Sequence, residues 1–276
     1  MRQKFLSTEQ QYKSYRALRI RAGRVGRSAL EEATMPLFVR GNVSIYYEQR
    51  GSGFPLLLLP PGGMNATVSF WERTAFNPVE IFASDYRVIA LDQRNAGSSS
   101  GPLDMEDPWG AYAEDQLGLM NHLGIEKFHV LGCCIGCSYA LNLIRRAPAR
   151  VVSAVLEQPI GIDDANRQVL PNAWVDWANQ LVQKRTDVNM ALLEAFGKRM
   201  WRGEFVLSVS REFVRSCHTP LLVLPGIDLP HPTAIGREIA ALAPHAEVLE
   251  PWKEPADLVP QAVERIRRFL QNHTPA

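Results

Sequence analysis

The feature that most constrains this chain is a series of short, continuous apolar runs that alternate with segments of helical spacing. The runs fall at residues 55–60, 86–92, 128–133, 151–158, 219–226 and 246–251. Runs of this kind are typical of strands that are buried on both faces. Apolar residues recur at helical intervals in segments 115–125, 135–148 and 258–271. We therefore predict an α/β fold with a mostly parallel, doubly wound sheet.

Two further segments depart from this alternation. Residues 37–49, LFVRGNVSIYYEQ, predict a β-hairpin that turns at Gly41-Asn42. Residues 161–215 are rich in aromatic side chains at helical spacing and contain no evident strand, so we predict a helical cap at the end of the sheet where the loops gather. The predicted organisation is an N-terminal helical arm or tail at 1–36, a core at 37–160 and 216–276, and the cap.

Composition excludes several classes of partner. The chain has 276 residues with 30 basic and 29 acidic side chains, a net charge of +1, so charge indicates neither a nucleic-acid partner nor a membrane partner. No apolar run reaches the roughly 18 residues that a membrane span needs. The N-terminus has no secretory pattern, and we expect a cytoplasmic protein with reduced thiols. A homodimer paired through the N-terminal arm is one arrangement that the sequence allows.

Three of the four cysteines lie in one predicted strand-to-helix turn, Gly132-Cys133-Cys134-Ile135-Gly136-Cys137. The pattern G-x-C-x-G corresponds to the nucleophile elbow G-x-S-x-G, in which the central side chain is exposed at the tip of a tight turn. Cys134 would lie at the start of a helix, where free N–H groups and the helix dipole favour a thiolate. The sequence therefore predicts Cys134 as a nucleophile.

Other interpretations of these cysteines remain open. A zinc site is disfavoured because no Cys/His pair follows downstream. Cys134 and Cys137 have the C-x-x-C spacing of redox proteins. Cys134 could also line a pocket without covalent chemistry, whereas Cys133 and Cys137 are expected to be buried as small apolar residues.

Four segments, in order, resemble the α/β-hydrolase family: LLLLPPGGMN (56–65), ALDQRNAGSSS (90–100), the helix–strand–elbow–helix segment 120–141, and TPLLVLPGIDLPHP (219–232). Asn95 replaces a glycine of the second segment, and Asn tolerates left-handed backbone well. The resemblance implies an α/β-hydrolase fold and a Cys134 similar to the nucleophile of dienelactone hydrolase. It also implies an oxyanion hole formed by the N–H groups of Ile135 and of the loop with Gly63 and Met64, and Asp228 as the acid.

The histidine base of that family is missing from its usual place. The segment after the last predicted strand, EVLEPWKEPADLVPQ (247–261), contains no histidine. Of the six histidines, only His231 follows the carboxyl end of a predicted strand. We predict that His231 acts as the base and is oriented by Asp228, with Glu250 and Glu254 as alternative carboxylates.

The functional expectation is a cysteine-dependent hydrolase of a small apolar ester, lactone or thioester, acting through an acyl-enzyme on Cys134. Trp174, Trp177 and Trp252 are the predicted substrate-binding residues. The absence of the usual histidine leaves two alternatives open. One is a non-hydrolytic enzyme of the same fold, of the lyase, cyclase or cofactor-free oxygenase type. The other is a degenerate protein that binds a small molecule. No metal, nucleotide or flavin motif is visible, so no cofactor is predicted.

Overall fold

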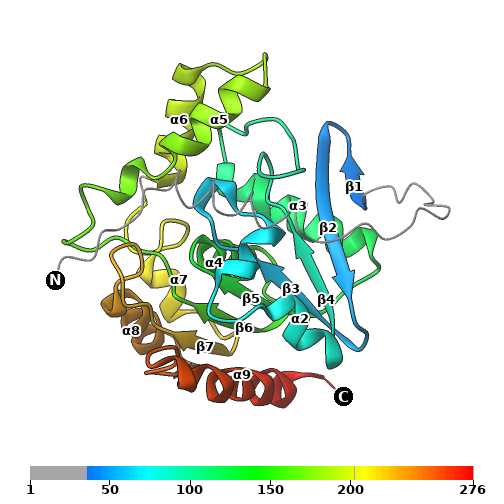
Figure 1. Ribbon diagram of the computed structural model, residues 1–276, viewed down its shortest axis with the longest axis vertical. Helices are drawn as coiled ribbons and strands as arrows, with labels where there is room; N and C mark the ends of the chain where they lie inside the picture. The colour runs from blue at the N-terminus through cyan, green and yellow to red at the C-terminus, as the bar shows by residue number, and fades with distance from the viewer. Residues whose placement is uncertain (1–35, 202, 276) are drawn as a thin grey trace, which may run out of the picture. The chain divides into compact units, whose positions relative to one another are not determined.

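The computed structural model describes residues 36–201 and 203–275. These residues form an eight-stranded sheet in the order β1-β2-β4-β3-β5-β6-β7-β8 (Figure 1). The six strands from β3 to β8 are parallel to one another, whereas β1 and β2 form an antiparallel edge beside β4. The strands are β1 Leu37–Arg40, β2 Val43–Arg50, β3 Phe54–Leu59, β4 Tyr86–Leu91, β5 Phe128–Cys133, β6 Val151–Glu157, β7 Leu221–Leu224 and β8 Ala246–Val248. The predicted mostly parallel α/β class is confirmed.

Helices cover both faces of the sheet. The α-helices of the described residues are α2 Pro78–Ile81, α3 Pro108–His122, α4 Ile135–Arg146, α5 Val175–Lys184, α6 Met190–Trp201, α7 Arg211–Arg215, α8 Thr233–Leu242 and α9 Val259–His273. One apolar core packs α3, α4 and α8 against one face, and a second core packs α2 and α9 against the other. Each central strand therefore needs apolar side chains on both faces, which is why the strands read as uninterrupted apolar runs.

Two local predictions are confirmed in the structure. Arg40 and Val43 are paired across the Gly41-Asn42 turn, so β1 and β2 form the predicted hairpin. Asn95 has φ 62°, the left-handed backbone expected where the similar family carries glycine.

The predicted cap segment 161–215 contains α5, α6 and α7 and, in its described part, no strand. Trp177 packs against Phe196 with ring centroids 5.8 Å apart, so α5 and α6 share a small aromatic core. In Figure 1, α5 and α6 lie at the top of the described structure and α9 lies at the bottom. The predicted arm, apart from Pro36, lies outside the described residues, so its structure and its pairing stay predictions.

Some elements differ from the sequence prediction. The last strand ends at Val248 rather than at Pro251, because Val248 pairs with Val223 and the neighbouring strand β7 itself ends one residue later, at Leu224. Helix α8 follows directly after the His231 loop.

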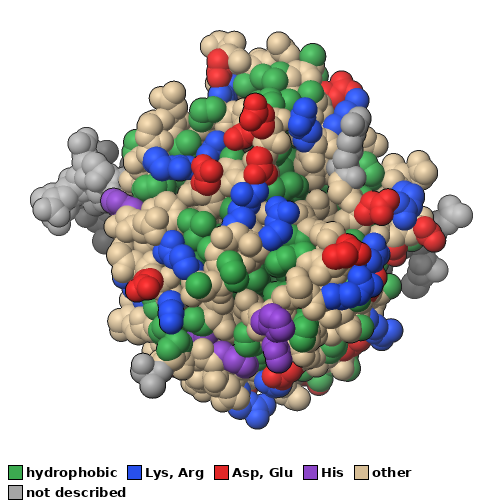
Figure 2. Space-filling model, turned by 180° about the vertical axis from the view of Figure 1, so that it is seen from behind, with side chains coloured by type: hydrophobic (Ala, Val, Ile, Leu, Met, Phe, Trp, Pro, Cys, Tyr) green, Lys and Arg blue, Asp and Glu red, His purple; other side chains and the backbone are tan. Residues whose placement is uncertain are grey.

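Surface charge is mixed. Figure 2 shows basic and acidic side chains interspersed over the visible face, as the balanced composition leads one to expect. In this part of the chain, no helix combines the length and apolar character that crossing a bilayer needs.

Candidate active site

Cys134 occupies a strained turn between β5 and α4. Its backbone has φ 58° and ψ −119°, a conformation that non-glycine residues rarely adopt. The N–H of Cys134 donates to the Glu157 carbonyl at 3.0 Å, which ties the turn to the neighbouring strand. A Cβ on Gly136 would lie 2.0 Å from the Leu59 carbonyl oxygen, so only glycine allows this close approach of helix and strand. The elbow predicted from G-x-C-x-G is therefore present as backbone geometry.

The Cys134 sulfur lies among groups that favour its negative charge. Burial alone would raise the pKa of the thiol, but the nearby His231 ring and the backbone N–H groups of Ile135 and Gly62 outweigh it, and the pKa is lowered. A lowered pKa increases the fraction of thiolate, which is the nucleophilic form. Cys134 is also partly exposed, whereas Cys133, Cys137 and Cys217 are buried.

Two backbone N–H groups, those of Ile135 and Gly62, lie beside the Cys134 sulfur and help to lower the pKa of the thiol. Gly62 precedes a short helical turn, Gly63–Asn65, in which the Met64 side chain is buried in the core. The predicted oxyanion roles of Ile135, Gly63 and Met64 stay predictions.

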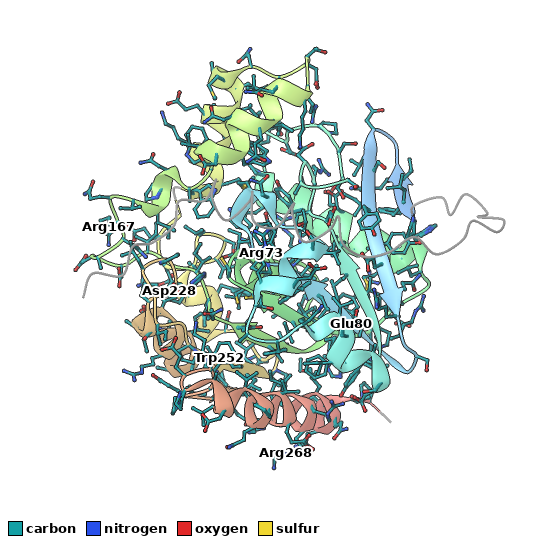
Figure 3. The ribbon with its side chains drawn as sticks, viewed as in Figure 1. Arg73, Glu80, Arg167, Asp228, Trp252 and Arg268 are labelled. Carbon is teal, nitrogen blue, oxygen red and sulfur yellow. The ribbon has the colours of Figure 1, made fainter. Side chains whose placement is uncertain are left out.

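Asp228 and His231 form one compact loop after β7. The His231 Nδ1 atom lies 2.5 Å from Asp228 Oδ1, and the His231 N–H donates to the Asp228 carbonyl at 3.0 Å. A Cβ on Gly226 would lie 2.3 Å from the His231 Cβ, so the glycine makes room for the ring. Figure 3 labels Asp228 in this loop. The structure thus brings the predicted base and the predicted acid together.

His231 and Cys134 are electrostatically coupled. Burial would lower the pKa of His231, but the Cys134 charge and the Asp228 carboxylate raise it to about 10. The contact with His231 lowers the pKa of Asp228. The His231 Nε2 atom is buried and makes no hydrogen bond among the described residues, so it remains available for proton transfer. Cys134, His231 and Asp228 therefore form one electrostatically coupled group.

The alternative carboxylates do not reach His231. Glu250 pairs with Arg237 at 2.8 Å, and Glu254 is exposed in the loop before α9. Asp228 is therefore the carboxylate in contact with the ring.

The three predicted substrate-binding tryptophans are in different surroundings. Trp252 is buried against α9, and its Nε1 donates to the Pro225 carbonyl at 2.8 Å, so it packs within the core (Figure 3). Trp174 packs on Gly197 between α5 and α6. Trp177 donates to the Asn95 carbonyl at 2.9 Å and lines a cavity of about 150 Å³ together with Asn65 and Arg185.

Two residues beside the site were not predicted. The ring of Trp201, at the end of α6, lies 3.7 Å from the point where a Cβ on Gly63 would be, so α6 packs next to the loop that contains Gly63. Glu157, at the end of β6, is completely buried next to Cys133. Glu157 could have been noticed in the sequence as a carboxylate at the end of an otherwise apolar strand. The contact between Trp201 and Gly63 joins distant segments, and no local sequence pattern predicts it.

The other interpretations of the cysteines find little geometric support. All four cysteines are free thiols, and the Cys137 thiol donates to the Gly132 carbonyl at 3.1 Å inside the core. Burial raises the pKa of Cys137 well above its ordinary value, which disfavours a reactive C-x-x-C pair. Within the described ranges, no three His, Cys, Asp or Glu side chains are placed to hold a metal ion.

Comparison with known proteins agrees with this architecture. A protein of Azorhizobium caulinodans named as a carbamate hydrolase, RutD, is 31% identical over 125 residues, which is 44% of this chain and 43% of that protein. A 2-hydroxy-6-oxo-6-phenylhexa-2,4-dienoate hydrolase of Burkholderia cepacia is 30% identical over 139 residues, 48% of each chain. The chain spans about half the length of the curated relatives it matches.

A solved structure of a meta-cleavage product hydrolase from Pseudomonas fluorescens superimposes with a TM-score of 0.64 at 19% identity, covering 87% of this chain and 98% of that one. Residues 55–203 match the family model described as the alpha/beta hydrolase fold, and this match includes β3, the elbow and most of the cap. With the sheet order, the elbow and this match together, the chain belongs to the α/β-hydrolase family.

Proposed function

We propose that this protein is a cysteine-dependent hydrolase that cleaves a small ester, lactone or thioester through an acyl-enzyme on Cys134. The observation that carries the proposal is the convergence of Cys134, His231 and Asp228 from two separate loops. Activation of a cysteine by an adjacent base, itself oriented by a third group, is the recurring arrangement of nucleophilic catalysis.

The proposed reaction has two stages. The Cys134 thiolate attacks the carbonyl carbon, and the N–H groups of Gly62 and Ile135 stabilise the oxyanion. The intermediate collapses, and the leaving group takes the proton from the His231 imidazolium. Neutral His231 then accepts a proton from water as the water attacks the acyl carbon. The sulfur leaves as a thiolate, and a carboxylic acid is released.

The substrate class follows from the surroundings of the elbow. Trp174, Trp177, Phe196 and Trp201 make the cap next to the oxyanion loop aromatic, which favours an apolar acyl group. Relatives named as a carbamate hydrolase and as a 2-hydroxy-6-oxo-6-phenylhexa-2,4-dienoate hydrolase support hydrolysis as the reaction type. The specific acyl group is the part of the proposal that a substrate panel must define.

The proposal is tested by kinetics on a panel of p-nitrophenyl esters, lactones and thioesters. We expect Cys134→Ala to abolish turnover and His231→Ala to lower kcat/KM by about two orders of magnitude, the usual effect of losing a general base. Cys217→Ala is the matched control, because this buried thiol lies outside the site, and it should retain wild-type turnover. Full turnover by Cys134→Ala would contradict the proposed acyl-enzyme on Cys134. Ligand-induced stabilisation without any turnover would favour a binding protein.

A further inference from the structure

Glu157 is a buried carboxyl group that the proposed reaction leaves unexplained. It is the last residue of β6, it has no exposed surface, and neither of its side-chain oxygens has a hydrogen-bond partner among the described residues. A buried polar group without partners costs free energy, so its retention calls for a reason.

The position of Glu157 connects it to the elbow. In the sheet register Glu157 is opposite Cys133 on one side and Leu224 on the other, and its carbonyl accepts the Cys134 N–H at 3.0 Å. The strand that contains Leu224 leads into the Asp228–His231 loop. Glu157 therefore lies in the strand between the one that presents the nucleophile and the one that presents the base.

The charged and titratable groups around Glu157 come from every neighbouring element. Burial raises the pKa of Glu157 to about 8, and the Cys133 thiol, the Lys253 ammonium and the His231 ring partly offset that rise. The Cys137 thiol of α4 donates to the backbone carbonyl of Glu157 at 3.3 Å, and the Glu157 carboxylate contributes to the raised pKa of that thiol. Lys253 contacts the side chain of the next residue, Gln158, and the Lys253 charge also acts on Asp228.

The free thiolate and the acyl-enzyme place different demands on His231. Before acylation, the negative charge on the Cys134 sulfur makes the largest contribution to raising the pKa of His231 and so stabilises its imidazolium form. In the acyl-enzyme the sulfur is bonded to carbon and uncharged. When water then gives its proton to His231, the imidazolium forms without this counter-charge, and Asp228, which is about half exposed, is the carboxylate left in contact with it.

We propose that Glu157 is a positioning residue for deacylation, whose carboxylate stabilises the His231 imidazolium while Cys134 carries the acyl group. This inference rests on the proposed function. The Glu157 carboxylate exchanges its own proton with solvent and takes no part in bond making, so the hydrolysis balances as written above. It acts only through the charge that it adds near His231.

The sign of the pH dependence follows from this role. Raising the pH ionises Glu157, adds a negative charge near the ring and speeds deacylation. At low pH Glu157 is neutral, and a glutamine in its place has nearly the same shape and the same lack of charge. The effect of Glu157→Gln should therefore grow with pH, whereas a merely structural role would change the rate similarly at every pH.

The test is single-turnover kinetics with rapid quenching and intact-protein mass spectrometry, comparing wild type, Glu157→Gln and Glu157→Asp with the p-nitrophenyl ester that the wild type hydrolyses best. At pH 6 we expect equal deacylation rates. At pH 9 we expect Glu157→Gln to deacylate about tenfold more slowly, the change that one pKa unit of lost stabilisation produces. Glu157→Asp, which keeps the charge, should recover part of the rise with pH.

The outcomes separate this inference from the proposed function. The formation of an acyl-enzyme on Cys134 in all three proteins, with identical deacylation profiles, would overturn the role of Glu157 and leave the proposed function intact. The absence of an acyl-enzyme in the wild type would overturn both. Thermal unfolding of each variant provides the folding control, and Glu157→Asp keeps the test usable if Glu157→Gln does not fold.

Discussion

At the scale of single residues, the site depends on how burial and charge compete at one sulfur atom. Burial opposes ionisation of Cys134, and the neighbouring His231 ring and two backbone N–H groups favour it. The lowered pKa shows that the second effect is larger. The same physics acts with the opposite result at Cys133, where burial and the nearby Glu157 carboxylate raise the pKa of the thiol. Reactivity should therefore be confined to one of two adjacent cysteines.

The role of His231 in activating the thiol predicts a specific change in alkylation. In His231→Ala the burial of Cys134 remains while its largest favourable partner is lost, so the pKa of the thiol rises. At pH 7 we expect iodoacetamide to label Cys134 at least about tenfold more slowly than in the wild type, since each pKa unit changes the thiolate fraction by that factor. Peptide mapping by mass spectrometry measures the labelling at each cysteine. Equal rates in the two proteins would show that His231 does not activate the sulfur.

At the scale of elements, the proposed base His231 lies in the loop between β7 and α8, whereas the sequence comparison led us to expect a histidine in the segment after the last strand. The loop is short and tightly bonded. Thr233 Oγ1 donates to the Gly226 carbonyl at 2.7 Å, and His231 is bonded to Asp228 through both its backbone and its ring. Trp252 and Lys253 occupy the segment where the family has its histidine. The segment after β6 also supports this loop, since Asn166 Nδ2 donates to the Leu229 carbonyl at 2.9 Å.

The close contact between Gly226 and His231 makes the loop sensitive to a single methyl group. Gly226→Ala would push a Cβ to within 2.3 Å of the His231 Cβ, so the loop must shift. We expect kcat/KM to fall by about two orders of magnitude, the effect of displacing a catalytic group by about 1 Å. Steady-state kinetics on the best ester provides the measurement.

Gly124→Ala is a suitable control for this substitution. Gly124 has φ 68°, and a Cβ there would meet no atom within 4 Å. This variant should lose about 1 kcal/mol of stability from backbone strain and keep its activity. If Gly226→Ala were as active as the control, the packing of the loop would not determine the position of His231.

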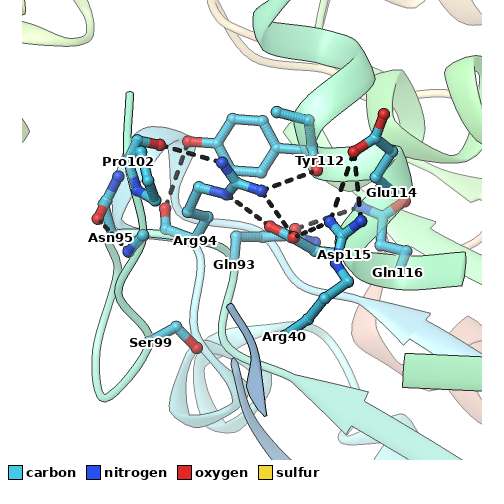
Figure 4. Close-up of polar contacts among 12 residues, drawn as sticks. Arg40, Gln93, Arg94, Asn95, Ser99, Pro102, Tyr112, Glu114, Asp115 and Gln116 are labelled. Atoms are coloured by element: carbon cyan, nitrogen blue, oxygen red, sulfur yellow. Dashed lines mark hydrogen bonds and ion pairs between the residues drawn. The ribbon is translucent and has the colours of Figure 1, made fainter. Parts of the chain in front are cut away.

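At the scale of the whole described molecule, the segment 92–101 joins the sheet, α3 and the cap. Asp92 accepts the backbone N–H groups of Val68 and Ser98, and the buried Arg94 guanidinium pairs with Asp115 of α3 at 2.7 Å (Figure 4). Asn95 accepts from Trp177 and Arg185 at the two ends of α5. This loop is thus one of the polar connections between the segment 161–215 and the core, beside the apolar cluster that the two share and the hydrogen bonds of Ser138 with Val206 and Ser208.

The Arg94–Asp115 pair predicts a large effect on stability. Both side chains are buried, so Asp115→Asn would leave the Arg94 charge without its partner. We expect the free energy of unfolding to fall by about 3–5 kcal/mol, as is typical when one member of a buried pair is removed. Urea denaturation of Asp115→Asn and of the adjacent exposed variant Glu114→Gln provides the comparison. The control should change stability by less than about 1 kcal/mol, and a similar small change for Asp115→Asn would contradict this assignment.

Sequence reasoning succeeded where the determining contacts are local. Continuous apolar runs identified the strands, since burial on both faces acts on each residue of a strand. The pattern G-x-C-x-G located the elbow because Gly132 is required by the close contact with Gly136 and Cys137 in the same turn, although Gly136 also allows a close approach to the distant Leu59. The order of the strands, the Gly62 N–H, the contact of Trp201 with the loop that contains Gly63 and the isolation of Glu157 depend on segments far apart in the sequence. No local pattern encodes these contacts. The predicted roles of the site residues, the homodimer and the cytoplasmic location stay predictions.

The most direct measurement is the mass of the protein quenched during turnover of a slowly hydrolysed ester. The account predicts a transient increase equal to the mass of the acyl group, located on the peptide that contains Cys134, and an increase that lasts longer in His231→Ala than in the wild type. Turnover with no acyl group on that peptide at any time point would contradict it.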